Sequence, residues 1–373
     1  MELASLRATG FRNLASARLD WGSGCNLVSG PNGQGKTNLL EAIAVLGNLR
    51  SFRAAGARKL VCHGTAGFDL EGEVVEGTTR TTLRQVVEVG SPPRRQLFID
   101  DQPVMTDRYL PVCPVVAMSS EDRGLVVGEP VVRRAFLDRF AYLLESAVLE
   151  EVRTYRRCLR QRNAALDHGD DQLAVWERAL ANAAARVVAR RRTAVERLTG
   201  RFGDVYDDLA PDHFPRITLE YRPESWLDPS QTSVEVEEMY VQRYTRERAR
   251  DRRMGHTLDG PHRHDLALRA DGRTARDVLS SGQTKVVAAA LRLAMLEHVE
   301  HERQRVLPVI VDDIDAELDR STLDRVVRRL GMGRQVFLSS AHGEAAFRAP
   351  SGMRIFVMEA GRRLTAHDRE IHE

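Results

Sequence analysis

The segment Gly30-Pro-Asn-Gly-Gln-Gly-Lys36-Thr37 constrains the fold of this chain more than any other feature. Apolar residues 26–28 precede it, and residues 37–46 follow it with the apolar spacing of a helix. A strand, a glycine loop and a helix in this order bring backbone N–H groups and a helix N-terminus to where they can surround phosphates. Lys36 is expected to reach the β and γ phosphates, and the Thr37 hydroxyl to bind Mg²⁺. The pattern predicts a nucleotide site, and a glycine-rich turn without a ligand is the alternative.

A second segment supplies the carboxylates that such a loop needs. The apolar run 306–311 is typical of a buried parallel strand, and Asp312 and Asp313 follow it directly. Asp312 is the expected metal ligand, and Asp313 is the expected base that orients an attacking water. Because many buried strands simply end in an acidic turn, this interpretation depends on the loop upstream.

A third segment lies shortly before the carboxylate strand. Residues 279–283 read Leu-Ser-Ser-Gly-Gln, and an apolar helix is expected over 286–296. Hydroxyls and free N–H groups at a helix N-terminus form an anion site. Read in isolation, Ser280 is equally well an ordinary N-cap residue, with Gly282 in a flexible first turn. The candidate ligand residues are Ser280, Ser281, Gly282 and Gln283.

The order of the elements predicts an α/β domain assembled from both ends of the chain. The length of 373 residues, 42% of them hydrophobic, suits about two domains. We expect residues 1–125 and 255–373 to form the α/β domain, lobe I, and residues 126–254 to form a mainly helical insertion, lobe II. The expected strands are 3–9, 25–29, 68–75, 81–89, 96–99, 114–118, 306–311, 335–338 and 354–358, with a hairpin turn at Asp100-Asp101. The expected helices are 37–46, 133–144, 149–166, 172–202 and 234–250, and the proline-rich stretch 211–230 is expected to be irregular.

Charge and cysteine usage exclude several functional classes. The formal net charge is only +2, so attraction to nucleic acid requires local clustering of cations. Lysine occurs only at positions 36, 59 and 285, and arginine supplies the other 52 of the 55 basic side chains. The four cysteines are too far apart in sequence for a zinc site or a redox pair. Without an apolar leader or spanning segment, we expect a cytoplasmic protein with no membrane association.

The ordered set of loop, five-residue signature and carboxylate strand resembles the ABC-type ATPase head. Ala316-Glu-Leu-Asp319 then stands where that class has its D-loop. Within the class, the chain resembles the RecF family of recombination mediators in bacterial DNA repair. The segments that carry this resemblance are Phe11-Arg-Asn13, Gly30 to Asn38, Ser51-Phe-Arg53, Arg134 to Asp138, Leu159 to Asn163, Gly260-Pro-His-Arg263 and Asp312-Asp313 with Glu317-Leu-Asp319.

The resemblance implies an ABC-type P-loop ATPase head with a helical inserted lobe, ATP and Mg²⁺ as cofactors, and weak, DNA-stimulated ATP hydrolysis that acts as a switch. ATP bound by one protomer is expected to be closed over by residues 280–283 of a second, which gives an ATP-dependent homodimer on double-stranded or gapped DNA. The implied partners are DNA, RecR and RecO, and the implied output is RecA placed on single strands coated by SSB, in repair, replication restart and the SOS response. The implied ATP-binding residues are Gly30, Pro31, Asn32, Gly33, Gln34, Gly35, Lys36, Thr37 and Asn38, with Lys36 and Asp313 catalytic and Thr37 and Asp312 on the metal.

Two positions depart from the ABC pattern. Transport-type members have a glutamine after the strand that is expected here at 114–118, whereas this chain has Ser119-Ser-Glu-Asp122, so no glutamine switch is assigned. His342 falls about one residue beyond the place of a histidine that senses the γ-phosphate. That role and an ordinary surface histidine both stay open.

Arg153, Arg156, Arg157 and Arg160 recur at helical spacing and predict a cationic face that contacts DNA phosphates without sequence preference. Residues 123–253 contain 24 arginines and 22 acidic residues, so a solvated charged face is the alternative. Other ABC-type functions also stay open, namely an SMC-like structural protein and the nucleotide-binding subunit of a transporter. Against the transporter, Lys36 and Ser280 lie 244 residues apart, and against the SMC-like protein, the insertion is too short for a long coiled coil.

Overall fold

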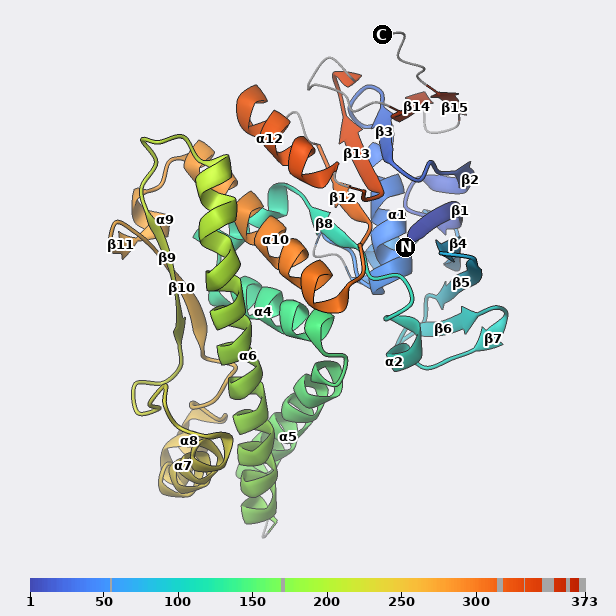
Figure 1. Cartoon of the computed structure of the whole chain (residues 1–373). Coiled ribbons are helices and arrows are strands. Elements are labelled where there is room, and N and C mark those ends of the chain that lie inside the picture. Colours follow the sequence, from blue (N-terminus) through green and yellow to red (C-terminus); the bar gives the residue numbers. More distant parts are fainter. Residues whose placement is uncertain are drawn as a thin grey trace. The chain divides into compact units, whose positions relative to one another are not determined.

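The computed structural model describes residues 1–53, 56–168, 172–313, 318–331, 333–343, 352–359 and 363–368 (Figure 1). The chain divides into two compact units. Unit 1 comprises residues 1–122, 205–212 and 281–373, and unit 2 comprises residues 123–204 and 213–280. No helix within the described ranges combines the length and the apolar character that a membrane span requires.

Unit 1 contains a mainly parallel sheet built from both ends of the chain, as the sequence predicts. Its strand order is β15-β14-β3-β13-β12-β8. The five strands from β14 to β8 are parallel to one another, and β15 pairs antiparallel with β14. The bounds are β3 Cys25–Ser29, β8 Val116–Met118, β12 Val309–Val311, β13 Val336–Ser340, β14 Arg354–Glu359 and β15 Arg363–Asp368. Among the described residues, the helices that accompany it are α1 Lys36–Asn48, α10 Ser281–Arg303 and α12 Arg320–Leu330.

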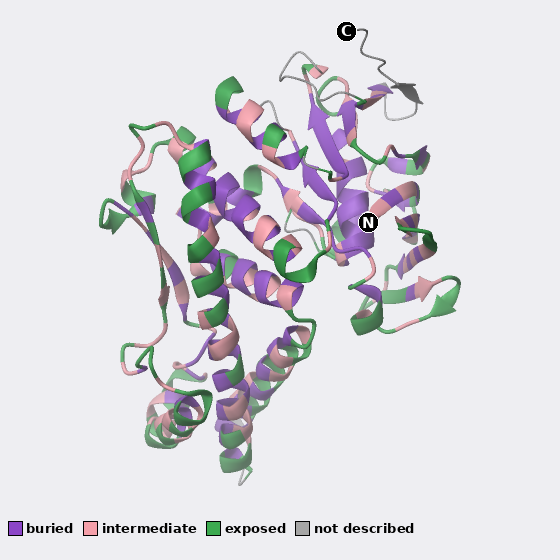
Figure 2. Ribbon diagram, viewed as in Figure 1, coloured by how far each residue is buried: buried purple, intermediate pink, exposed green. Residues whose placement is uncertain are grey.

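A second, antiparallel sheet completes unit 1, with strand order β2-β1-β4-β5-β6-β7. Helix α1 contacts β13 of the first sheet as well as β1, β4 and β5 of the second, and Figure 2 shows α1 and β13 deeply buried. Asp100 and Asp101 join β6 to β7 with φ values of 49° and 60°, the left-handed pair of a two-residue hairpin turn. The bounds are β1 Glu2–Phe11, β2 Leu14–Asp20, β4 Gly67–Glu76, β5 Thr79–Glu88, β6 Arg94–Ile99 and β7 Gln102–Pro103, with α2 Thr106–Tyr109 and short 3-10 turns at Ala57–Leu60 and Ser120–Arg123.

Unit 2 is mainly helical but also holds a three-stranded antiparallel sheet with the order β11-β10-β9. Its largest element is α6, a 37-residue helix whose last residues belong to unit 1. The helices are α3 Gly124–Val127, α4 Pro130–Leu144, α5 Val148–His168, α6 Leu173–Leu209, α7 Ser233–Arg246, α8 Arg248–Met254 and α9 Ala275–Val278. The strands are β9 Ile217–Arg222, β10 Asp265–Ala270 and β11 Arg273–Thr274.

The structure corrects three expectations from the sequence. The stretch 211–230 is not wholly irregular, because β9 lies within it. Strand β10 pairs with β9, so residues 255–280 group with the insertion and not with lobe I, whereas residues 205–212 group with the head. The single helix expected at 234–250 is two helices, since Glu247 leaves the helical conformation at φ −92° and ψ 7°.

A buried arginine organises the helical part of unit 2. Arg162 on α5 is fully buried, and its Nη1 donates to Asp251 Oδ2 and Thr257 Oγ1, each at 2.7 Å. Its Nη2 donates to the Tyr244 carbonyl oxygen at 3.2 Å and to Glu177 Oε1 at 3.4 Å. The guanidinium also lies over the Tyr244 ring, 4.8 Å from the centroid. One planar side chain thereby ties α5 to the segments that carry its four partners.

We expect Arg162→Met to lower the free energy of unfolding by about 3 to 5 kcal/mol, because it leaves the Asp251 carboxylate buried without its cation. Arg160→Met, at an exposed position on the same helix, should change it by no more than about 0.5 kcal/mol. Urea unfolding followed by circular dichroism measures both. Equal stability of the two variants would show that the buried ion pair does not hold α5 in place.

Candidate functional site

The glycine loop between β3 and α1 has a backbone that only glycine adopts without strain at several positions. Gly30, Gly33 and Gly35 have φ values of 146°, 82° and 105°. A Cβ at Gly30 would lie 2.4 Å from the Met358 carbonyl oxygen, and one at Gly35 would lie 2.6 Å from the Asn13 side chain. Helix α1 starts directly after Gly35, so its first N–H groups and those of the loop are available to a phosphate.

Lys36 folds back over this loop. Its side chain is almost fully buried, and Nζ donates to the carbonyl oxygens of Gly30 and Pro31 at 2.7 and 3.1 Å and to Asn32 Oδ1 at 3.4 Å. These acceptors are neutral, and an ionised phosphate oxygen forms a stronger bond with an ammonium group. The ammonium is therefore held where a phosphate can take over as its partner.

The sheet brings the loop and the carboxylates together. Strand β13 lies between β3 and β12, and because all three run parallel, their carboxyl ends meet at one edge. At this edge Thr37 Oγ1 donates to Asp312 Oδ1 at 3.0 Å, although the two residues are 275 positions apart in the sequence. The two predicted metal ligands are thus in direct contact. Hydroxyl and carboxylate oxygens are the ligands that Mg²⁺ prefers, so these two residues fit the ion.

Ser339 joins the two carboxylate residues, and the sequence did not identify it. Its hydroxyl, on β13, donates to Asp312 Oδ1 at 2.7 Å and accepts from the Asp313 backbone N–H at 2.7 Å. Asp313 has a left-handed backbone with φ 54°, so this bond holds a turn that a non-glycine residue rarely adopts. Ser339 therefore fixes the path of the chain between the expected metal ligand and the expected base.

The pKa of Asp312 lies above the usual aspartate range, and burial is the main cause. The neighbouring Asp313 raises it further, whereas the hydrogen bonds from Ser339 and Thr37 and the charge of Arg53 act against the rise. A buried carboxylate that its surroundings stabilise incompletely gains from a cation. The electrostatics of the site therefore agree with a metal at Asp312.

A cluster anchored on α1 supports the other side of the loop. Glu41 is fully buried and accepts from Arg12 Nε and Nη2 at 2.8 and 2.7 Å and from the Ser51 hydroxyl. Arg53 lies 3.9 Å from Glu41 and donates to Asn38 Oδ1 at 3.3 Å. The Asn38 amide in turn donates to Asn13 Oδ1 at 2.8 Å, and the Asn13 amide donates to the Gln34 carbonyl oxygen at 3.4 Å. Segments 11–13 and 51–53 thus meet at the nucleotide loop.

Comparisons with known proteins place this geometry in a family. The family model described as "RecF/RecN/SMC N terminal domain" matches residues 2–363. A curated "DNA replication and repair protein RecF" from Anaeromyxobacter sp. (strain Fw109-5) is 37% identical over 325 residues, 86% of each chain. Another, from Azotobacter vinelandii, is 33% identical over 384 residues, 99% of this chain and 100% of the relative. This chain belongs to the RecF family.

Solved structures show the same fold. A structure described as "the recombination mediator protein RecF-ATPrS in RecFOR pathway" matches with a TM-score of 0.86, at 24% identity over 96% of each chain. An SMC head bound to the C-winged helix domain of ScpA matches with a TM-score of 0.57, at 14% identity over 99% of this chain and 98% of the other. The fold is therefore that of the ABC-type ATPase head with a helical lobe, as the sequence predicts.

The five-residue signature of this RecF-family chain, residues 279–283, spans the start of helix α10. Ser280 precedes the helix, and Ser281 and Gly282 lie in its first turn, all three exposed, with Gln283 half-buried. Gly282 has no positive φ, and a Cβ there would meet nothing within 4 Å. Neither the backbone nor a neighbour among the described residues requires glycine at this position, and the space beside it is open.

The segment after β8 takes a structural role in place of the glutamine of transport-type proteins. Asp122 is buried, accepts from the Ser119 backbone N–H at 3.0 Å, and binds Arg292 Nε and Nη2 of α10 at 3.0 and 2.6 Å.

His342 is exposed in the loop after β13. This loop passes close to the end of β3, because a Cβ on the next residue, Gly343, would lie 3.1 Å from Ser29 Oγ. The γ-phosphate role and an ordinary surface histidine both stay open for His342.

The D-loop is only partly covered by the structure. Ala316 and Glu317 lie outside the described residues. Asp319 caps α12: burial opposes ionisation, but hydrogen bonds from Ser321 and Thr322 lower its pKa to about 2. Asp319 therefore has a local structural function in addition to its place in the motif.

The predicted arginine face lies on α5. Arg153, Arg156, Arg157 and Arg160 are all exposed, and Val152, Tyr155 and Cys158 occupy the buried face. Within the described part of the chain, only Arg156 of the four has an acidic partner, Asp138 at 3.8 Å. The Arg156 side chain is nevertheless 62% exposed. Three of the four guanidinium groups are therefore not neutralised by ion pairs among the described residues.

We expect Ser339→Ala to lower the rate of ATP turnover and the affinity for Mg²⁺ in the presence of ATP, each by roughly ten- to a hundredfold, because losing a hydrogen bond that orients a metal ligand has effects of that size. Nucleotide affinity without Mg²⁺ should stay at the wild-type value, since the loop around Lys36 is intact. Titration with a fluorescent ATP analogue and a phosphate-release assay measure these quantities. Wild-type turnover and Mg²⁺ dependence in the variant would contradict a positioning role for Ser339.

Proposed function

We propose that this chain is an ATP-dependent DNA-binding protein of recombinational repair and replication restart, acting in the cytoplasm. It dimerises on double-stranded or gapped DNA when it binds ATP, and works with RecR and RecO to load RecA onto SSB-coated single strands. The observation that carries the ATP-dependent part is the hydrogen bond from Thr37 to Asp312, which joins the phosphate loop to the carboxylate strand. Curated relatives named for DNA replication and repair, and a structure whose description places RecF in the RecFOR pathway, support the rest.

Each group of site residues has a separate role in the proposed binding and hydrolysis of ATP. Backbone N–H groups of residues 30 and 32–38, since Pro31 has none, and the Lys36 ammonium bind the β and γ phosphates of ATP. Thr37 and Asp312 hold Mg²⁺, which offsets phosphate charge when it is bound. Asp313 accepts a proton from the attacking water, and Ser339 keeps its backbone in place. The expected activity is weak ATP hydrolysis that DNA stimulates and that reopens the dimer.

The signature residues have a use mainly in a two-protomer site. The loop around Lys36 already supplies N–H groups to the phosphates from its own chain. Ser280 to Gln283 offer a second set of hydroxyl and N–H donors on an exposed helix start, with free space around Gly282. We infer that they approach the γ-phosphate of ATP bound by the other protomer.

Two other ABC-type functions, an SMC-like structural protein and a transporter subunit, explain fewer features of the structure. A long SMC coiled coil is absent from the described residues, in which α5 and α6 span 21 and 37 residues. The two helices are tied together by Arg190 of α6, whose Nε and Nη2 donate to Glu151 of α5 at 2.8 and 3.0 Å. Against a transporter subunit, Lys36 and Ser280 lie 244 residues apart, which leaves room for a whole inserted unit. ATPase activity that rises with DNA, and not with lipid vesicles, separates the proposal from the transporter.

We expect Ser280→Arg to bind ATP as a monomer but to fail to dimerise, because the long side chain blocks the interface and the hydroxyl is lost. Ser280→Ala, which removes only the hydroxyl, should weaken dimerisation less. Sedimentation velocity with and without ATP measures both. Mixing Ser280→Arg with Lys36→Ala protein creates heterodimers with one intact composite site, so ATP should bring the two together better than it does either alone. A Ser280→Arg protein that dimerises with ATP would exclude the two-protomer site.

Replacing Arg153, Arg156, Arg157 and Arg160 by Gln should weaken DNA binding and flatten its salt dependence. Each lost phosphate contact removes about 0.9 from the slope of log K against log salt. The matched control replaces four exposed arginines of unit 1, Arg18, Arg80, Arg94 and Arg108, and so removes the same charge. Fluorescence anisotropy with a labelled duplex at several salt concentrations measures the slopes. Equal slopes for both variants would show that only overall charge matters and that α5 is a solvated face.

A further inference from the structure

The end of the long helix α6 is held by α12, the helix that follows the D-loop position. Arg325 of α12 donates from Nη2 to the Leu209 carbonyl oxygen at 3.0 Å, and Leu209 is the last residue of α6. The final carbonyl groups of a helix have no partner within the helix, and a cation beside them also interacts favourably with the helix dipole. Arg325 therefore caps α6 from a different helix.

The same arginine connects this cap with the start of α12. Its Nη2 also donates to Thr322 Oγ1 at 3.2 Å, and the fully buried Thr322 hydroxyl donates to Asp319 Oδ2 at 2.7 Å. Asp319 is the last residue of the D-loop segment and the N-cap of α12. A continuous series of hydrogen bonds thus leads from the D-loop position to the last turn of α6.

A second arginine, one turn further along α12, joins three helices. Arg329 Nε donates to Asp208 Oδ2 of α6, and its Nη1 donates to Glu297 Oε1 of α10, both at 2.6 Å. The side chains of Arg329 and Glu297 are only 22% and 18% exposed, so water and salt screen this pair less than an ordinary surface ion pair. The helix after the D-loop position is therefore attached both to the helix that starts at the signature and to the end of α6.

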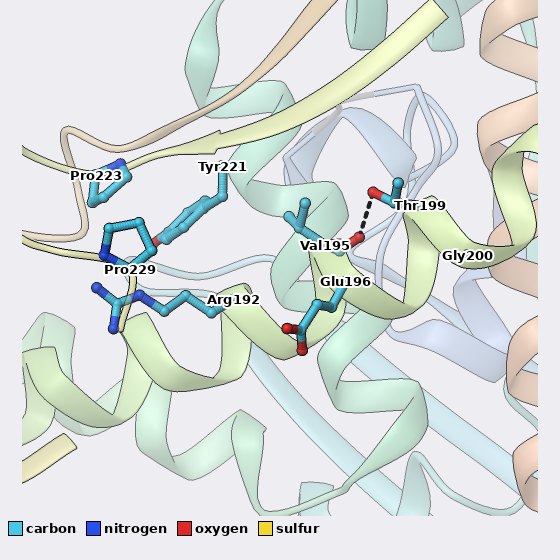
Figure 3. A pocket seen from close by; sticks show the side chains of 8 residues that line it. All are labelled: Arg192, Val195, Glu196, Thr199, Gly200, Tyr221, Pro223 and Pro229. Atoms are coloured by element: carbon cyan, nitrogen blue, oxygen red, sulfur yellow. Dashed lines mark hydrogen bonds between the residues drawn. The ribbon is translucent and has the colours of Figure 1, made fainter. Parts of the chain in front are cut away.

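Three consecutive arginines attach the middle of α6 to the elements around it. Arg190 donates to α5 at 2.8 Å, and Arg191 Nε donates to Asp138 Oδ1 of α4, also at 2.8 Å. Arg192 Nη2 donates to the Asp228 carbonyl oxygen at 2.8 Å, and Figure 3 shows its side chain extending from α6 toward the prolines that follow β9. Because α6 is one helix, α12 holds its last turn while α4 and α5, which carries the arginine face, hold its middle.

We propose that Arg325 and Arg329 are positioning residues that couple ATP-driven closure at the D-loop and signature to the DNA affinity of the arginine face on α5. The inference rests on the function proposed above, in which ATP-bound protomers close over each other on DNA. A shift of α12 or α10 on closure passes through the two arginines to α6, and α6 is attached to α5. Thermodynamic linkage then requires DNA to raise the affinity for ATP by the same factor.

The test measures this coupling factor in the whole chain, as the ratio of its affinities for a labelled duplex with and without a saturating, slowly hydrolysed ATP analogue. Fluorescence anisotropy gives both affinities. The nucleotide should raise the DNA affinity of the wild type by about tenfold, and that of Arg329→Met by less than about twofold. Sedimentation velocity should show ATP-dependent dimerisation in both proteins, since the signature and the loop around Lys36 are unchanged in the variant.

Matched variants separate coupling from a general loss of stability. Arg334→Met removes a 2.7 Å ion pair with Glu300 of α10, at a side chain that is less exposed than Arg329 and has no contact with α6 among the described residues. It should keep the wild-type coupling factor. Asp208→Asn weakens the attachment from the α6 side and should lower the factor. Asp207→Asn removes the same charge from the next residue, which is exposed and forms no ion pair within the described ranges, and should not lower it.

A wild-type coupling factor in Arg329→Met would overturn the inference, and so would an equal loss in Arg334→Met or equal effects of the two aspartate variants. Loss of ATP-dependent dimerisation in Arg329→Met would also overturn it, because the arginine would then act at the interface between protomers. A wild-type protein whose DNA affinity does not respond to nucleotide would contradict the proposed function itself, and the inference with it.

Discussion

Two hydroxyl groups from distant parts of the chain donate to one oxygen of Asp312. Thr37 comes from the first turn of α1 and Ser339 from β13, and the carboxylate itself follows β12. The arrangement exists only when β13 pairs in parallel with both strands, so the N-terminal and C-terminal parts must fold together before the site forms. The burial that raises the pKa of Asp312 also makes a bound cation favourable there. The fold of this sheet and the positions of the residues around Asp312 thus depend on the same three strands, β3, β13 and β12.

The arginines of α5 lie in two contrasting environments, one buried and one exposed. Arg162 points into unit 2, where its donors satisfy a carboxylate, a hydroxyl and a carbonyl oxygen in one buried cluster. Two residues earlier, Arg160 is exposed, in line with Arg153 and Arg157, and forms no ion pair among the described residues. The planar fork of five donors suits both burial with several acceptors and contact with phosphates. A helix whose inner face is fixed by such a cluster presents its outer cations in a defined arrangement.

The elements that could be predicted from the sequence are those with a local pattern. The glycine loop, the apolar strand before Asp312 and the Asp100-Asp101 turn each have residue types that only a few backbone conformations allow. Ser339 carries no such pattern, because a serine near the end of a buried strand gains its role only from the neighbours that the sheet provides. The pairing of β9 with β10 escaped prediction because it joins residues more than 40 positions apart across a proline-rich stretch. The break at Glu247 was missed because the charged residues around it fit one long helix as well as two.

The central claim is that the Thr37–Asp312 pair is the cation site of an ATP-binding head. The most direct measurement is the affinity of the wild-type protein for a fluorescent ATP analogue with and without Mg²⁺, alongside Thr37→Val and Asp312→Asn. We predict that Mg²⁺ tightens binding to the wild type, and that this gain is largely lost in both variants while their Mg²⁺-free affinities stay comparable. An equal Mg²⁺ effect in all three proteins would contradict the account, because the cation would then be held elsewhere.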